Sequence, residues 1–154
     1  MNDKNLEEAR EVASKIDLRQ FIEPGFVTYT FDKCLPNKVH VTFRSLSTQE
    51  IQGITRDVRK YRKGISVPGG ELEPGDIPGE EEARTYAAIR ELAGHTHSLG
   101  DMDFTQMTHE DRVKTLYKMV DNLTGILYAK LQIFKHGVAL ALSPESGEDP
   151  VKKS

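Results

Sequence analysis

The chain of 154 residues has little of what several protein classes depend on: one cysteine, no tryptophan and a hydrophobic share of only 37%. A single cysteine excludes an internal disulfide framework and a zinc site built from several cysteines. No apolar run approaches the roughly 20 residues that cross a bilayer. The N-terminal residues also lack the charged-then-apolar order of a signal peptide. We therefore expect a protein made in a reducing compartment, without a membrane segment.

Charge is nearly balanced, with 21 Lys and Arg against 24 Asp and Glu and a formal net charge of -3. The length suits one domain. The apolar residues fall in periodic groups, which predicts a folded chain despite the low hydrophobic share. Because so little apolar material is available, we expect the chain to complete its core on a partner.

Alternating residues predict an antiparallel hairpin near the N-terminus. Val27, Tyr29 and Phe31 share one face of the first strand. Val39, Val41 and Phe43 share one face of the second, and Leu35-Pro36-Asn37 between them is typical of a turn. A two-stranded hairpin is marginal by itself, so we expect helices to cover its apolar face.

Four helices are predicted from apolar spacings of three and four residues and from their capping signals. They span residues 3–16, 47–63, 80–93 and 108–136. Ser47 and Glu50 form a capping box at the start of the second helix. The last helix carries a long apolar stripe over residues 113–134, which we expect its own domain to cover incompletely.

The sequence thus predicts an α+β fold in which an N-terminal hairpin packs on a bundle of three to four helices. We divide the chain into a helix and linker (1–24), the hairpin and helical domain (25–142) and a polar tail (143–154). Residues 64–79 hold five glycines and three prolines and are predicted to form an exposed loop inside that domain.

Two oppositely charged surfaces are the candidate partner-binding sites. The basic one is a helix face with five cations: Arg56, Arg59, Lys60, Arg62 and Lys63. The acidic one lies in the following loop, where the candidates are Glu71, Glu73 and Asp76. Locally opposed charge suits an oriented protein partner, although the basic face could also hold nucleic acid phosphates.

Signals for catalysis or cofactor binding are weak. His95 and His97 are two residues apart and precede two aspartates, which makes them the sole candidate metal ligands. A polar loop between two helices explains the same residues, and no distant ligand is identifiable. Cys34 lacks a positioned base. We therefore expect no catalytic residue, no metal and no cofactor.

The segment from residue 25 to residue 50 resembles the tail assembly chaperones and hub-type baseplate accessory proteins of long-tailed phages. In these families a short β element followed by a Phe-Arg-x-Leu-Ser/Thr-x-x-Glu pattern leads into helices. The resemblance covers about a quarter of the chain. The matching residues are Gly25, Val27, Tyr29, Phe31, Val41, Phe43, Arg44, Leu46, Ser47 and Glu50.

The resemblance implies a non-enzymatic tail or baseplate morphogenesis protein that acts by protein–protein binding. Its partners would be other tail or baseplate proteins, a tape-measure protein among them, in an oligomer or hetero-complex. It would act in the host cytoplasm during assembly or as a minor subunit of the virion tail. Two alternatives stay open: a small nucleic-acid-binding or regulatory protein that uses the 56–63 helix face, and a metal-dependent enzyme that uses His95 and His97.

Overall fold

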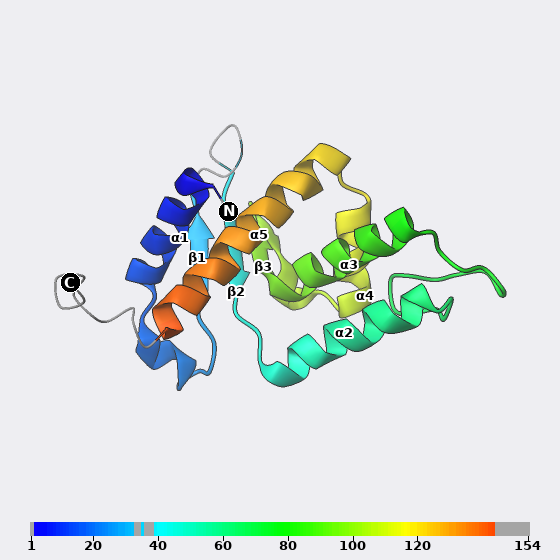
Figure 1. Cartoon of the computed structure of the whole chain (residues 1–154), viewed down its shortest axis with the longest axis horizontal. Helices are drawn as coiled ribbons and strands as arrows, with labels where there is room; N and C mark the ends of the chain where they lie inside the picture. Colours follow the sequence, from blue (N-terminus) through cyan, green and yellow to red (C-terminus); the bar gives the residue numbers. More distant parts are fainter. Residues whose placement is uncertain (1, 33–34, 36–38, 144–154) are drawn as a thin grey trace.

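Four short antiparallel strands form the sheet at the centre of the fold (Figure 1). The computed structural model describes residues 2–32, 35 and 39–143. Within them the strands are β1 (Thr28–Phe31), β2 (Val41–Arg44), β3 (Thr96–Leu99) and β4 (Met102–Asp103), in the spatial order β1-β2-β3-β4.

The predicted hairpin is confirmed, and its register follows the alternation in the sequence. Tyr29 pairs with Phe43, and Phe31 pairs with Val41. Phe31, Val41 and Phe43 are all buried, so the apolar face of the hairpin points into the core. Cys34 and the turn residues Pro36 and Asn37 lie outside the described residues.

The prediction that residues 95–107 form a loop is wrong, because this segment contains β3, β4 and a short 3-10 helix η3 (Phe104–Gln106). β3 pairs with the free edge of β2, with Val41 opposite Leu99. Residues 96–99 lack strict alternation, and their extended conformation depends on that edge. β2 lies more than fifty residues before β3 in the sequence, so the local pattern of residues 96–99 could not predict this pairing.

Five α-helices surround the sheet in the described part of the chain. The helices are α1 (Asp3–Lys15), α2 (Thr48–Arg62), α3 (Glu80–His95), α4 (His109–Tyr117) and α5 (Asp121–Leu142). A short 3-10 helix η1 (Leu18–Phe21) follows the first of them. α5 runs diagonally across the molecule, with α1 on one side and α2, α3 and α4 on the other (Figure 1). This arrangement is an α+β fold, as predicted.

The single helix predicted from residue 108 is wrong, because the chain breaks between Tyr117 and Asp121 into α4 and α5. The two pieces pack against different partners: α4 lies on α3, whereas α5 packs against α1 and also contacts α3 and β2. One straight helix could not reach both sets of contacts. α5 continues through residues 138–142, beyond the end predicted near residue 136.

Helix α1 shares the core of the rest of the chain. Ala9 and Val12 are fully buried and belong to the same apolar cluster as Phe43 and Phe134. Lys130 donates hydrogen bonds to Glu8 at 2.7 and 3.1 Å, and Gly137, further along α5, lies against Val12, further along α1. The two helices therefore run in the same direction. The tail from residue 144 lies outside the described residues.

The predicted loop 64–79 is exposed over most of its length, but two of its residues are buried. Val67 and Gly70 form an isolated β-bridge, and both are buried. A β-carbon on Gly70 would lie 2.7 Å from the ring of Tyr86, so only glycine fits there. Residues 73–77 of the loop are exposed. No helix in the described part of the chain is both long enough and apolar enough to span a membrane.

Candidate functional site: an apolar groove between three helices

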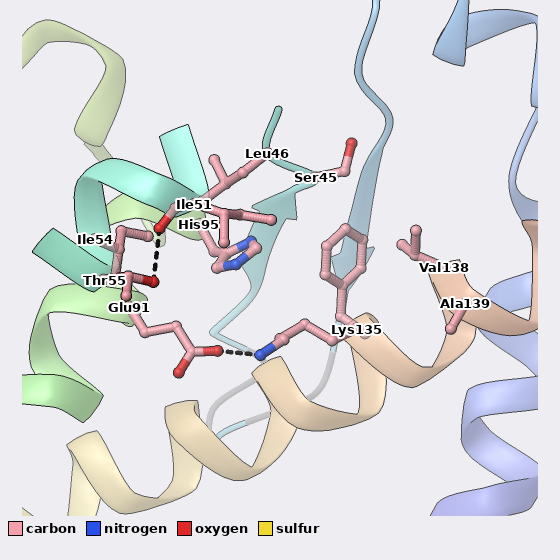
Figure 2. Close-up of a pocket in the computed structure, with 11 residues that line it drawn as sticks. Ser45, Leu46, Ile51, Ile54, Thr55, Glu91, His95, Lys135, Val138 and Ala139 are labelled. Atoms are coloured by element: carbon pink, nitrogen blue, oxygen red, sulfur yellow. Dashed lines mark hydrogen bonds and ion pairs between the residues drawn. The ribbon is translucent and has the colours of Figure 1, made fainter. Parts of the chain in front are cut away.

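A groove of about 420 Å³ lies between the start of α2, the end of α3 and the C-terminal half of α5. Figure 2 shows Ile51 and Ile54 on its α2 side and Val138 and Ala139 on its α5 side. The remaining lining residues are Ser45, Leu46, Thr55, Glu91, His95, Phe134 and Lys135. Six of these eleven lining residues are apolar, and three are titratable: Glu91, His95 and Lys135.

The α2 wall is held in place by the capping box at the start of that helix. The Glu50 amide donates to Ser47 Oγ at 3.2 Å, and the Ser47 amide donates to Glu50 Oε1 at 3.0 Å. Arg44 Nη2 donates to the same carboxylate at 3.1 Å, which ties the helix start to the end of β2. This capping box was predicted from the sequence and is confirmed.

His95 lies inside the groove and is positioned by the sheet. Its Nδ1 is 2.8 Å from the backbone oxygen of Arg44, so Nδ1 carries a proton and donates. Its ring meets that of Phe134 edge-on, with centroids 6.5 Å apart. Burial lowers the pKa of His95, because an imidazolium would lose its hydration there. The groove thus holds a neutral imidazole near neutral pH.

Glu91 and Lys135 form an ion pair that closes one end of the groove (Figure 2). The hydroxyl of Tyr128 also donates to Glu91, at 3.2 Å. The charge of Glu91 is therefore compensated, and the groove carries little net charge of its own. Such a surface is suited to an apolar ligand face with a few polar contacts.

No family model, curated protein or solved structure matches this chain. What the groove does therefore has to be inferred from its own residues.

All five cations of the predicted basic face are exposed on α2, but none of them lines the groove. Arg62 pairs with Glu80 at 3.0 Å. The other four form no ion pair with any described residue: Arg56, Arg59, Lys60 and Lys63. The face is thus a solvated surface of unneutralised positive charge.

The acidic candidates Glu71, Glu73 and Asp76 are exposed in the loop and also lie outside the groove. Glu71 is 3.9 Å from Lys114 Nζ, a weak and exposed contact. The structure therefore does not bring the two predicted surfaces into one site.

His95 and His97 form no cluster of metal ligands with the other residues that the structure describes. Nowhere in the described ranges do three or more His, Cys, Asp or Glu side chains gather closely enough to hold an ion. His95 is engaged by Arg44, as described above, and His97 is half-buried with no hydrogen-bond partner on Nδ1 among the described residues.

The sequence pointed to the groove residues only as members of apolar stripes or, for His95, as a candidate metal ligand. Ile51 and Ile54 belong to the apolar stripe of α2, and Phe134 ends the 113–134 stripe, of which Val113, Leu116, Leu127 and Leu131 are buried. Ile51 differs, because 49% of it is exposed. Periodicity identifies the face of a helix but not which of its residues a neighbour covers.

Proposed function

We propose that this protein is a non-enzymatic phage tail or baseplate morphogenesis factor that binds a helical segment of another tail protein in the groove between α2 and α5. The single observation that supports binding is the half-exposed Ile51 beside a groove with aliphatic walls. Exposed apolar surface rimmed by polar groups is typical of interaction sites. The assignment to phage tails depends on the resemblance of residues 25–50.

The occupant that fits is the apolar face of an amphipathic helix with carboxylates beside its stripe. α2 and α5 form the long walls of the groove, and a helix of the partner can lie between them by the usual rules of helix packing. Thr55 lines the groove, and the exposed Arg59 lies four residues further along α2, on the same face of the helix. Positive charge therefore continues along the α2 wall beyond the groove. Acidic residues flanking the stripe would complement that charge and set the orientation of the partner.

Site-specific photo-crosslinking tests the proposal during phage production. A photoreactive amino acid replaces Ile51 in the full-length chain, and the captured proteins are identified by mass spectrometry. The matched control replaces Ile126, which is 41% exposed on α5 and does not line the groove. We expect position 51, and not position 126, to capture a tape-measure, tube or baseplate protein.

Each other outcome contradicts part of the proposal. Capture of a second copy of this chain would make the groove a self-association site. Equal capture at both positions, or none at position 51, would overturn partner binding in the groove. Capture at position 51 of a host protein, with no tail protein, would overturn the assignment to tail assembly.

A second candidate function is nucleic acid binding by the basic face of α2. The observation that favours it is that Arg56, Arg59, Lys60 and Lys63 are exposed and form no ion pair with described residues. Affinity for DNA or RNA should then fall steeply between about 50 and 200 mM salt, because phosphate contacts release counterions. Absence of binding at about 50 mM salt would eliminate this candidate.

A further inference from the structure

A second recess, of about 330 Å³, lies on the other side of the start of α2, against the end of α3 and the beginning of α4. It shares only Leu46 and Ile54 with the groove. Its polar lining consists of Gln49, Glu50, Arg56, Arg90 and His109. Nothing lies within 4 Å of a β-carbon built on Gly53, so the recess is open beside that residue.

Arg90 is the unusual member of this lining. Only 6% of the residue is exposed, which is rare for an arginine. Its Nε donates to Asp57 Oδ2 at 2.9 Å. Its Nη1 is buried and has no hydrogen-bond partner among the described residues. A buried guanidinium N–H without an acceptor is unfavourable, so we expect a bound group to accept a hydrogen bond from Nη1.

Further cations lie within electrostatic range of Arg90. The pKa of Arg112 is lowered, mainly by burial and then by the positive charges of Arg44 and Arg90. The buried Nε of Arg112 also has no hydrogen-bond partner in the described part of the chain. Partial burial, Arg90 and Arg112 lower the pKa of His109 in the same way. Like charges that converge in a partly buried place repel one another unless an anion lies among them.

The carboxylates nearby do not balance this charge. Asp57 is engaged by Arg90, and one oxygen of Glu50 already accepts from Ser47 and Arg44. A third carboxylate, Asp103, acts on Arg112. Three carboxylates therefore stand against four guanidinium groups, those of Arg44, Arg56, Arg90 and Arg112, and positive charge remains in excess. A buried water could accept one N–H bond, but it would not neutralise the excess positive charge.

We propose that this recess binds an oxyanion, a phosphate or carboxylate group, held by Arg56 and His109 at the rim and by the guanidinium of Arg90 at the base. Guanidinium groups bind both kinds of oxyanion through paired N–H donors. The ligand would be either a phosphate-bearing small molecule or the acidic side chain of a partner. This site is independent of the apolar groove and of the function proposed for it.

Thermal unfolding of the full-length protein tests the proposal. Sodium phosphate, sulfate or acetate is titrated at constant ionic strength, with sodium chloride making up the difference. A ligand that binds only the folded state raises the unfolding midpoint with the logarithm of its concentration. We expect phosphate or acetate to do so in the wild type. Stabilisation by phosphate and sulfate alone indicates a phosphate ligand, and stabilisation by acetate indicates a carboxylate.

The variants Arg56→Gln and His109→Gln remove rim donors and leave the buried Arg90–Asp57 pair intact. We expect each to weaken the apparent anion affinity about tenfold, as the loss of one charge-assisted hydrogen bond does. Arg59→Gln is the matched control, because Arg59 is exposed on the same helix and does not line the recess. The proposal is overturned if no oxyanion stabilises the protein more than chloride, or if Arg59→Gln weakens the effect as much as Arg56→Gln.

Discussion

Gly137 of α5 lies so close to Val12 of α1 that a β-carbon on the glycine would be 2.6 Å from Val12 Cγ1. The backbone oxygen of Ala9 would be only 2.9 Å away. Both contacts are shorter than van der Waals separation, and one involves backbone that cannot rotate aside. The close approach brings α1 onto the helix that also forms one wall of the groove.

Gly137→Ala should therefore destabilise the protein. We expect a loss of about 1–3 kcal/mol in the free energy of unfolding, the usual range for overpacking a well-packed core. Gly125→Ala is the control in the same helix, because nothing lies within 4 Å of its added β-carbon. That substitution should stabilise the protein by about 0.5–1 kcal/mol. Urea unfolding measures both, and equal effects would contradict the close packing of α1 on α5.

Ile51→Asp should weaken partner binding without unfolding the protein. Because Ile51 is 49% exposed, we expect stability to change by no more than about 0.5–1 kcal/mol. Affinity for the tail protein captured at this position should fall at least about tenfold, since a carboxylate would be desolvated against the apolar face of the partner. Ile126→Asp, at 41% exposure outside the groove, should bind normally. Calorimetry or surface plasmon resonance measures the affinities.

Acidification should destabilise the protein through His95. Its pKa is lowered in the folded state by burial, so below the ordinary value of about 6.5 the unfolded chain binds more protons than the native one. Stability therefore falls as the pH drops below about 6.5, until the folded pKa of His95 is passed, and is fully present above that range. His109 contributes with the same sign, because partial burial and the nearby arginines also lower its pKa.

His95→Asn isolates the contribution of the groove histidine. The asparagine amide can still donate toward the Arg44 carbonyl, but it does not titrate. The urea midpoint of this variant should depend less on pH between about 5 and 7 than that of the wild type. An unchanged pH profile would show that His95 does not couple protonation to folding.

Asp57→Asn should be strongly destabilising, because it leaves the charge of Arg90 buried without its counterion. The side chains of Arg90 and Asp57 are only 8% and 23% exposed, and the loss should be about 3–5 kcal/mol. Glu11→Gln removes the exposed pair with Lys15 and should change stability by about 0–1 kcal/mol. Thermal or urea unfolding of both variants provides the comparison, and similar losses would contradict the buried role of Arg90.

The elements that the sequence predicted correctly depend on neighbouring residues. Alternation in residues 27–31 and 39–43 predicted β1, β2 and their shared buried face, and Ser47 with Glu50 predicted the start of α2. The boundaries of α1 and α3 were also close, since caps and apolar spacing are local signals.

The errors concern contacts between distant residues. β3 depends on the free edge of β2, and the break after Tyr117 depends on the separate partners of α4 and α5. Gly70 is buried against the stacked rings of Tyr61 and Tyr86, although the rest of the loop is mostly exposed as predicted. None of these neighbours is adjacent in sequence, so no local pattern identified them.

The sequence alone therefore determined an α+β protein with a buried hairpin face, amphipathic helices and a basic face on α2, because alternation, helical spacing and charge follow directly from residue order. Only the tertiary structure decided which apolar residues remain uncovered and which charges converge. It left Ile51 exposed beside α5 and brought Arg90 from α3 to Asp57 on α2. Exposure and charge balance are set by neighbours far along the chain, and these exist only once the chain has folded.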